Sequence, residues 1–438
     1  MANCKGTVGI LTLGCKVNQY ESEAIGELFE ARGFCVRSAS LTCDVYVVNT
    51  CTVTAESDRK ARQMIRRLIA KNPAAYVLVT GCLGQVSPES LAAIEGVDYV
   101  SGNVNKTKIP EIAEALLAGG KKNPCPVVQT GDITLACFES MQIQKFDRTR
   151  AYVKIEDGCE SHCTYCIIPS ARGVIRSKPM NEVLDEVETL TRGGCREVVL
   201  TGIETASYGK DLKEGSLADL LEQVDALPNI GRVRLGSLDP SLMKQSFVDK
   251  IASLSSLAPH FHISMQSGSD NVLRLMKRKY NADMALAGIE RLRRAIPDVM
   301  FTTDMIVGFP GETEEDFEQT IEFARKARFL MIHVFPYSKR KGTPAAEMEG
   351  QVPEAVKKAR VARLSSLAAS IRCELLDDWI KHTDTAEVLF EEYENGYAYG
   401  HTSSFIRVRV PSEKSLRSQF ATIRPISTDG ELVDATLI

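Results

Sequence analysis

Three cysteines stand close together in the polar segment of residues 157–166, which reads D-G-C-E-S-H-C-T-Y-C. Cys159, Cys163 and Cys166 have the spacing C-x3-C-x2-C. A cubane iron–sulfur cluster has four irons and normally takes four thiolates. Because no fourth cysteine is near in the sequence, three thiolates can bind three irons and leave the last one open to a ligand. The alternative is that three thiols occur here by chance, although a loop this polar does not need three cysteines.

Three further cysteines follow short apolar runs in the N-terminal part of the chain. The runs are residues 9–13, 45–48 and 76–79, and the cysteines are Cys15, Cys51 and Cys82. Runs rich in Val, Ile or Leu that alternate with helical patterns predict an open parallel α/β sheet. Ligand sites in such sheets lie outside the carboxyl ends of the strands, so these cysteines can converge on one metal site. The alternative is that they are buried structural cysteines.

Length and composition narrow the class of protein. A chain of 438 residues predicts about two to four domains. A hydrophobic fraction of 44% and a charged fraction of 25% are typical of a soluble globular protein. We find no secretory signal and no apolar run of about 20 residues, so we expect a cytoplasmic protein without a membrane partner. In the cytoplasm, clustered cysteines favour metal ligands over disulfides.

The net charge of −4 means that any binding of nucleic acid must come from local basic patches. The loop clusters at residues 277–279 and 339–341 are candidates for contacts with an RNA backbone. The seven cysteines outside the two triads show no pattern and are interpreted as buried or idle thiols: Cys4, Cys35, Cys43, Cys125, Cys137, Cys195 and Cys373.

Six apolar segments alternate with helical patterns in the middle of the chain. The segments are residues 151–155, 197–200, 232–235, 261–265, 301–307 and 331–335. Six strand–helix units predict a partial TIM-like barrel, in which chemistry lies on the loops after the strands. Those loops are rich in glycine, which lets the backbone approach a ligand, although plain turn chemistry is the alternative. Asp304 alternates inward on the fifth strand, as a site acid or as a satisfied buried group.

From residue 385 onwards the apolar period changes to two. Short strands are predicted at residues 385–391, 397–400, 405–410, 419–424 and 432–438, with a strong turn signal at Asn395-Gly396. About 55 residues of short strands predict a small β-barrel. Arg407 and Arg409 project from one strand face and, with Arg417 and Arg424, are candidates for phosphate contacts; a solvated charged edge is the alternative.

The C-x3-C-x2-C segment, with Tyr165 directly before its last cysteine, resembles the cluster motif of the radical S-adenosylmethionine (SAM) superfamily. The resemblance implies that Cys159, Cys163 and Cys166 are metal ligands and catalytic residues. It implies that the open iron of a [4Fe-4S] cluster chelates SAM, and that an electron from the cluster cleaves SAM to a 5′-deoxyadenosyl radical. The cofactor-binding residues that it implies are Tyr165, Glu204, Ser237, Gln266 and Gly308.

The segment T-L-G-C-K-V-N-Q-Y-E-S (residues 12–22), followed by N-T-C and T-G-C, resembles the N-terminal domain of the methylthiotransferase family. The resemblance implies that Cys15, Cys51 and Cys82 are catalytic metal ligands. They would bind a second, auxiliary [4Fe-4S] cluster that carries the sulfur inserted into the substrate. Asn18 and Gln19 would lie beside this site, and capping the following helix is their alternative role.

The C-terminal strands resemble the TRAM domain, an RNA-binding module of tRNA-modifying enzymes. The three resemblances together predict an α/β chain of three domains. They are an N-terminal open parallel α/β sheet domain (1–141), a central partial (β/α)6 TIM-like radical SAM barrel (142–378) and a small C-terminal all-β TRAM barrel (379–438).

Within the methylthiotransferase family, residues 12–22 resemble the branch that acts on tRNA threonylcarbamoyladenosine. The resemblance implies conversion of N6-threonylcarbamoyladenosine at position 37 to its 2-methylthio derivative. The implied partners are SAM, the tRNA anticodon stem-loop and an external electron donor such as flavodoxin or ferredoxin. The alternatives are a methylthiotransferase for isopentenyladenosine 37 or for an aspartate of a ribosomal protein, and an RNA-binding iron–sulfur sensor without turnover.

Overall fold

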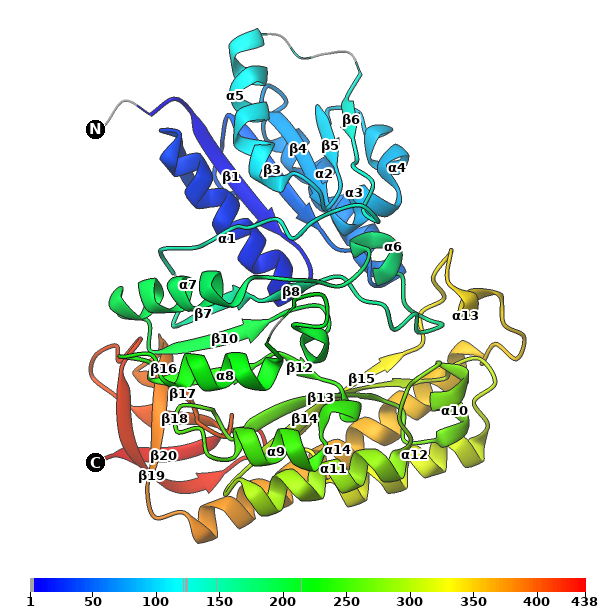
Figure 1. Ribbon diagram of the computed structural model, residues 1–438, viewed down its shortest axis with the longest axis vertical. Helices are drawn as coiled ribbons and strands as arrows, with labels where there is room; N and C mark the ends of the chain where they lie inside the picture. The colour runs from blue at the N-terminus through cyan, green and yellow to red at the C-terminus, as the bar shows by residue number, and fades with distance from the viewer. Residues whose placement is uncertain (1–3, 121, 123–124, 147, 214) are drawn as a thin grey trace.

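The computed structural model describes residues 4–120, 122, 125–146, 148–213 and 215–438. Its helices and strands form three bodies that follow one another along the chain (Figure 1). A sheet with helices on both faces lies at the top of the view, strand–helix units fill the middle, and a small barrel lies at the lower left. None of the described helices is both long enough and apolar enough to cross a membrane.

The N-terminal body is a six-stranded parallel sheet in the order β2-β1-β3-β4-β5-β6. Its strands are β1 (Thr7–Thr12), β2 (Cys35–Ser38), β3 (Val45–Thr50), β4 (Tyr76–Gly81), β5 (Tyr99–Ser101) and β6 (Val127–Gln129). Its helical segments are α1 (Lys16–Ala31), α2 (Ala55–Lys71), α3 (Cys82–Val86), α4 (Pro88–Ala92), η1 (Lys106–Lys108) and α5 (Ile109–Gly119). Helices α1 and α5 pack on one face of the sheet, and α2 and α4 pack on the other.

The predicted open parallel sheet is confirmed, and its central strands are the ones that the apolar runs marked. Every residue of β3 and β4 is buried, as expected for parallel strands covered on both faces. The prediction missed β2, β5 and β6. Strands β2 and β6 are mostly exposed edge strands and β5 has three residues, so none carries a long apolar run.

The lysines and prolines of residues 119–149 predict an irregular connector, but the structure forms β6 within this segment, which corrects the prediction. The strand pairs with β5 at the sheet edge. Three residues of the connector on which the prediction rested, Lys121, Asn123 and Pro124, lie outside the described residues.

The central body contains the six predicted strands, all parallel. They are β7 (Arg150–Lys154), β10 (Glu197–Thr201), β11 (Arg232–Leu235) continued after Gly236 by β12 (Ser237–Leu238), β13 (His260–Gln266), β14 (Met300–Val307) and β15 (Met331–Pro336). Two further two-residue strands, β8 (Glu156–Asp157) and β9 (Arg176–Ser177), pair with each other. The partial barrel is therefore confirmed.

Helices alternate with these strands and cover the outside of the partial barrel (Figure 1). They are α6 (Ile168–Arg172), α7 (Met180–Arg192), η2 (Thr205–Ser207), α8 (Leu217–Asp225), η3 (Pro240–Leu242), α9 (Gln245–Ile251), α10 (Asp270–Leu275), α11 (Ala282–Ala295) and α12 (Glu314–Ala327). The sequence pattern predicts one helix over residues 240–254, but η3 and α9 are separate. Lys244 between them has an extended backbone, which interrupts the helix.

The central body ends with α13 (Pro344–Glu347) and the long α14 (Glu354–His382), whose last turns pack against the C-terminal barrel. A closed five-stranded barrel follows, in the order β16-β17-β18-β20-β19, which confirms the predicted all-β module. Its strands are β16 (Ala386–Glu394), β17 (Tyr397–Thr402), β18 (Arg407–Pro411), β19 (Phe420–Thr428) and β20 (Val433–Leu437). Trp379 of α14 joins the core of this barrel together with Phe390 and Val408.

Candidate active site

The three N-terminal cysteines lie at one edge of the sheet. Cys15 precedes α1, Cys51 follows β3 and Cys82 begins α3. The last paired residues of strands β3 and β4 are Thr50 and Gly81. Cys51 and Cys82, which follow them directly, therefore lie side by side at the same end of the sheet. The structure thus brings together three thiols from loops that are far apart in the sequence.

Close backbone contact holds these loops together. Gly14 has a φ of +110°, and a Cβ at this position would lie 2.7 Å from the Cβ of Cys51. Asn18 donates from Nδ2 to the carbonyl oxygens of Leu13 and Thr50, at 2.7 and 3.0 Å. Asn18 therefore joins the loop before α1 to the end of β3, and α1 has no side-chain cap.

The thiol environment is compatible with a cluster rather than a single ion. Within the described part of the chain, no three His, Cys, Asp or Glu side chains are close enough together to hold one metal ion. A four-iron cluster differs because each thiolate binds a separate iron. Burial raises the pKa of Cys15 and raises that of Cys51 to about 11. Both thiols therefore stay protonated at neutral pH until a metal displaces the proton.

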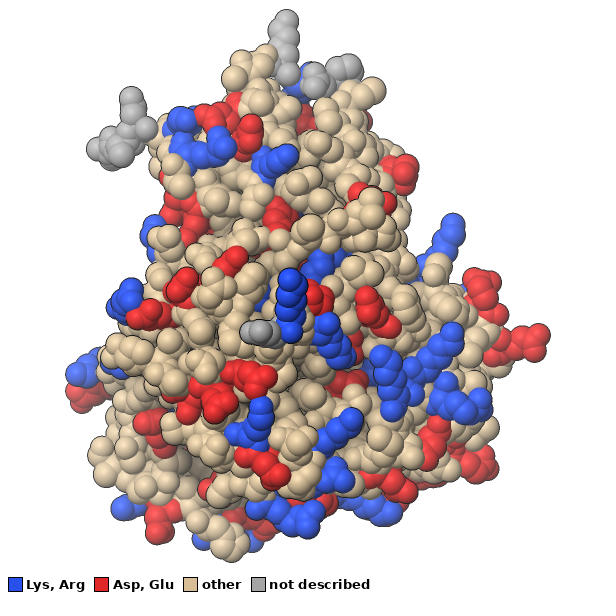
Figure 2. Space-filling model, viewed as in Figure 1, with Lys and Arg blue, Asp and Glu red and all other residues tan. Residues whose placement is uncertain are grey.

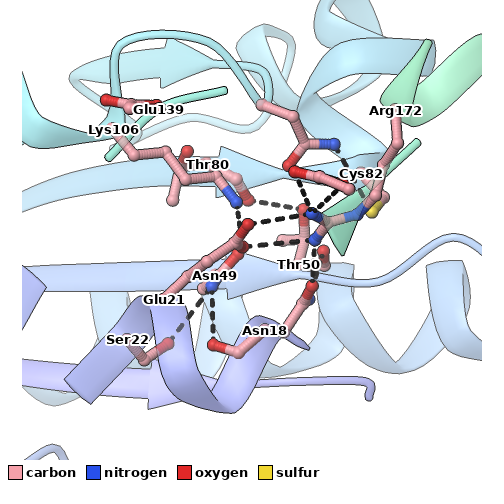
Figure 3. Close-up of polar contacts among 12 residues, drawn as sticks. Asn18, Glu21, Ser22, Asn49, Thr50, Thr80, Cys82, Lys106, Glu139 and Arg172 are labelled. Atoms are coloured by element: carbon pink, nitrogen blue, oxygen red, sulfur yellow. Dashed lines mark hydrogen bonds and ion pairs between the residues drawn. The ribbon is translucent and has the colours of Figure 1, made fainter. Parts of the chain in front are cut away.

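A fully buried arginine lies beside this triad, next to Cys82 (Figure 3). Arg172 Nη1 donates to Glu21 Oε1 at 2.8 Å and to Asp157 Oδ1 at 2.9 Å, and Nη2 donates to Asn18 Oδ1 at 2.6 Å. Among the described residues, Arg172 Nε has no hydrogen-bond partner. Burial alone would raise the pKa of Asp157, but Arg172, Lys154 and Arg176 together outweigh burial and lower the pKa, so this carboxylate stays ionised.

The buried network around Arg172 carries more positive than negative charge. Its ion-paired members are Lys106, Lys154, Arg172, Arg176, Glu21 and Asp157. Four cations face two carboxylates, which leaves two positive charges, or one if Glu139, beside Lys106 in Figure 3, is counted. Buried charge of one sign is unfavourable unless an anion adjoins it. Thiolates that hold a cluster at Cys82 and its neighbours would supply that anion, so the residues fit the group.

The central cysteines lie on the loop between β8 and α6. The loop turns at Gly158, whose φ is +86° and where a Cβ would stand 1.9 Å from the carbonyl oxygen of Val174. Cys159 follows directly and donates its backbone N–H to the carbonyl oxygen of Gly173 at 3.0 Å. Cys163 is buried and Cys166 is half-buried, so this triad forms a compact site after the first barrel strand.

Charged partners contact these thiols. Cys159 Sγ donates to Glu204 Oε2 at 3.1 Å, and Arg278 Nη1 donates to Cys163 Sγ at 3.2 Å. Burial, with Glu204 adding to it, raises the pKa of Cys159, and burial raises that of Cys166 to about 11. Cluster thiolates usually accept hydrogen bonds, as Cys163 Sγ does from Arg278, so this triad also fits a [4Fe-4S] cluster.

Two of the other expected SAM contacts lie at the ends of barrel strands. Ser237 is exposed just after β11, and Gln266 ends β13 with a φ of +67°, a left-handed conformation that is strained for a residue with a side chain. Tyr165 packs edge-on against Phe309, with 6.5 Å between the ring centroids. Their contacts with SAM stay predictions.

Gly308 is packed closely against the side chain of Lys357 in α14. Its N–H donates to Glu312 Oε2 at 3.0 Å, and a Cβ would stand 2.4 Å from Lys357 Cγ. The turn at Gly308 thus packs against α14 in this structure. A role in binding SAM stays a prediction for this residue as well.

A cavity of about 320 Å³ adjoins the central triad and opens among basic residues. Cys163, Glu204 and Asp239 line it, together with the basic residues Lys210, Lys244, Lys277, Arg278 and Lys279. Figure 2 shows Lys and Arg side chains gathered across the middle of this face of the molecule. Both signs of charge are present, as the amino and carboxylate groups and the sulfonium of SAM would require.

A larger cavity of about 710 Å³ lies between the N-terminal triad and the inside of the partial barrel. Gly14 and Cys15 line it from the N-terminal body, and Phe405 lines it from the C-terminal barrel. Most of the remaining lining residues alternate along the barrel strands: Arg150, Tyr152, Val199, Thr201, Arg234, His260, His262, Thr302, Asp304, Met331, His333 and Phe335. Asp304 faces inward, as its place on the strand predicted.

Phe405 packs tightly where the C-terminal barrel meets the central body. Its ring stacks between His260 and His401, with centroid distances of 4.5 and 4.6 Å. Its φ of +71° is unusual for a large side chain, which indicates that packing determines this conformation. The C-terminal barrel therefore contributes directly to the wall of the larger cavity.

The arginines expected to contact phosphate have acidic neighbours. Arg407 and Arg409 leave β18 on one face, as predicted, but Arg409 Nε donates to Asp434 at 2.7 Å and Arg407 lies 3.5 Å from Glu392. In the other basic loop, Arg340 is buried in an ion pair with Asp58, so it is unavailable to RNA. The basic residues around the 320 Å³ cavity are therefore better candidates for contacts with RNA phosphates than Arg407, Arg409 or Arg340.

Sequence reasoning missed the charged residues that join these parts. Arg172 lies in an ordinary helix end, and its partners are distant in the sequence. Lys16 directly follows Cys15 in the segment of residues 12–22, but nothing in the sequence indicated that it lines a cavity. The pairing of Glu204 with Cys159 was foreseen only as proximity to SAM.

Two family models match this chain. The model for the radical SAM superfamily covers residues 153–324, and that for the uncharacterized protein family UPF0004 covers residues 7–102. The threonylcarbamoyladenosine tRNA methylthiotransferase MtaB of Bacillus subtilis is 41% identical over 410 residues, which are 92% of this chain and 90% of that protein. The chain belongs to the methylthiotransferase family of radical SAM enzymes. The expected family is therefore confirmed.

Another relative in this methylthiotransferase family is slightly less similar. The tRNA-2-methylthio-N(6)-dimethylallyladenosine synthase of Carboxydothermus hydrogenoformans is 37% identical over 373 residues, 84% of each chain. The solved structure of the radical S-adenosylmethionine methyltransferase TsrM from Kitasatospora setae, with cobalamin and a [4Fe-4S] cluster bound, has a TM-score of 0.57 at 17% identity. It covers 78% of this chain and 77% of that one, and supports the fold alone.

Proposed function

We propose that this radical SAM methylthiotransferase converts N6-threonylcarbamoyladenosine at position 37 of tRNA to its 2-methylthio derivative. The observation that carries the proposal is that one cysteine of each triad lines a cavity of the partial barrel, Cys163 the smaller one and Cys15 the larger one. The name of the Bacillus subtilis relative, 41% identical, supports this substrate. The chain would divide into residues 1–141, 142–378 and 379–438, which act as cluster, radical and RNA-binding domains.

In this proposal each triad holds one [4Fe-4S] cluster. Cys159, Cys163 and Cys166 would hold the cluster that binds SAM, and Cys15, Cys51 and Cys82 the auxiliary one. When bound, the clusters and two SAM molecules supply a radical that removes hydrogen from C2 of the adenine, and the sulfur and methyl group that replace it. An aromatic C–H bond has no acidity that a general base could use, so a cofactor must supply this chemistry.

The protein's own residues position the reactants. The backbone N–H of Glu204 donates to the Glu156 carboxyl group at 2.8 Å, and its side chain accepts from Cys159 Sγ. Glu204 would thereby orient the loop of Cys159 beside the smaller cavity, where SAM would bind. The network of Arg172 fixes the N-terminal triad against that loop. The cavity of about 710 Å³ would receive the base, which must leave its stack before reaction, as is general for enzymes that act on bases.

The RNA would lie against the face that carries the basic side chains. The exposed lysines around the smaller cavity offer contacts with the phosphates of the anticodon stem-loop. The closed C-terminal barrel has the architecture of a TRAM-like domain and lies beside the larger cavity. An external donor such as flavodoxin or ferredoxin would supply electrons in the cytoplasm.

Isopentenyladenosine 37 is the second candidate substrate, since the relative that is 37% identical carries a name for that reaction. The test is an anaerobic reaction of the reconstituted enzyme with SAM, a reductant and tRNA that bears either modified base. Mass spectrometry of the digested nucleosides should find the methylthio group on the threonylcarbamoyl form. Product on the isopentenyl form alone, or on a ribosomal protein alone, would reject the proposed substrate.

A further inference from the structure

The larger cavity contains a cation without a counterion. Lys16 directly follows Cys15, begins α1 and lines this cavity. Across the described part of the chain, it forms no ion pair or hydrogen bond of the kinds found for the other lining cations. Lys16 is exposed on the cavity wall, so its three ammonium donors are open to solvent or to a bound anion.

The other two cations of the cavity wall are already paired. Arg150 forms ion pairs with Glu197 and Glu391. Arg234 donates from Nε to Glu197 at 2.7 Å and from Nη2 to the carbonyl oxygen of Thr402 at 2.8 Å. These guanidinium groups add positive charge near Lys16, but their own partners already neutralise them. Lys16 is therefore the cation of this wall that a bound anion would pair with.

Asp304 is the one carboxylate among the described residues that line the cavity. Its Oδ2 lies 3.4 Å from His262 Nε2, and it forms no ion pair with Lys16. The carboxylate that Lys16 lacks is therefore not provided by the wall of the cavity itself. A bound molecule that carries a carboxylate would complete the site.

We propose that Lys16 binds the carboxylate of the threonyl arm of the target nucleoside, an inference that rests on the proposed function. The arm leaves the adenine at N6, and sulfur is added at C2 of the same ring. Cys15 and Lys16 are consecutive, so one turn of chain presents both the cluster ligand and the group that holds the arm. An apolar isopentenyl arm would instead bury the ammonium without a partner.

This assignment makes Lys16 a residue that determines specificity. Binding by a single charge-assisted hydrogen bond predicts a preference for the acid of about 10- to 100-fold in kcat/KM. The preference must depend on the charge of the arm and not on its length. A purely structural lysine at the start of α1 would give no such dependence.

The experiment compares two anticodon stem-loop RNAs with the full-length reconstituted enzyme. In one RNA the threonylcarbamoyl arm has its free carboxylate, and in the other the same arm ends in a neutral methylamide. Wild-type enzyme should prefer the acid by about 10- to 100-fold, Lys16→Met should reduce this ratio to about 1, and Lys16→Arg should keep part of it. Lys60→Met, on the exposed face of α2, is the matched control and should behave as wild type.

Iron content and the visible spectrum, measured for each variant, separate loss of a cluster from loss of recognition. Equal use of both RNAs by the wild type would overturn the inference without any variant, and so would an undiminished preference in an iron-replete Lys16→Met protein. In either case the proposed function would stand. Wild-type enzyme that modifies neither RNA but accepts the isopentenyl form would reject the proposed function and the inference together.

Discussion

Arg172 donates hydrogen bonds from one nitrogen, Nη1, to Asp157 at 2.9 Å and to Glu21 at 2.8 Å. Asp157 stands two residues before Cys159, and Glu21 lies on α1, which begins next to Cys15. A single buried guanidinium therefore joins the loops that carry the two triads. This ion pair network therefore helps to fix the relative position of the two proposed clusters.

Replacing Arg172 by Met should destabilise the protein by about 3–5 kcal/mol, because Glu21, Asp157 and Asn18 would lose the buried guanidinium that donates hydrogen bonds to all three. The measurement is the free energy of unfolding from denaturant titration followed by circular dichroism. Arg59→Met is the control, since Arg59 pairs with Glu56 on an exposed face and its loss should have little effect. Equal effects of the two substitutions would contradict the role given to the buried network.

Removing either cysteine triad should remove half of the iron. Anaerobically reconstituted wild-type protein should contain about eight irons per chain, and each triple Cys→Ala variant about four. Cys195→Ala is the matched control, because Cys195 is buried but lies in neither triad and should keep the full content. A triple variant with undiminished iron would show that its cysteines are not ligands.

The described fold follows from local sequence signals where strands are long and buried. Residues 45–48 and 76–79 are apolar throughout, so they mark the centre of the first sheet, and residues 232–235 match β11 completely. Strands β2 and β6 could not be found in this way. They are short and exposed at an edge or end of the sheet, and only pairing with a neighbour makes them strands.

The candidate site was only partly predictable for a different reason. Cysteine spacing and strand order together place six thiols, because both are local features. Charged residues such as Lys154 and Arg172 resemble surface residues in a sequence, yet both are buried by partners from other parts of the chain. Long-range charge pairing leaves no periodic signal, so the network and the free Lys16 emerge only from the folded structure.

Acid should weaken the contact between the central body and the C-terminal barrel through Glu197. Burial alone would raise the pKa of Glu197, but Arg234, Arg150 and Arg232 outweigh it and lower the pKa to about 2. A carboxylate with a lowered pKa stabilises the fold above its unfolded pKa of about 4.3 and loses this effect as the pH falls toward 2. The contribution is about 3 kcal/mol, since a tenfold change in protonation corresponds to about 1.4 kcal/mol.

Glu197→Gln should therefore be less stable than wild type at pH 7, and the difference should shrink as the pH falls below about 4. Thermal unfolding of both proteins at a series of pH values measures this difference. Glu56→Gln, which removes an exposed carboxylate, is the control and should leave the pH profile of stability unchanged. A Glu197→Gln protein whose deficit stays constant down to pH 3 would contradict the pKa assigned to Glu197.

The central claim is that this methylthiotransferase modifies threonylcarbamoyladenosine 37 of tRNA and needs both triads to do so. The most direct measurement is nucleoside mass spectrometry of tRNA from cells that lack the protein. The 2-methylthio derivative should be absent and its unthiolated precursor should accumulate. Wild-type protein should restore the derivative, whereas neither triple cysteine variant should. An unchanged level of the derivative in the deletion strain, or restoration by either variant, would contradict the account.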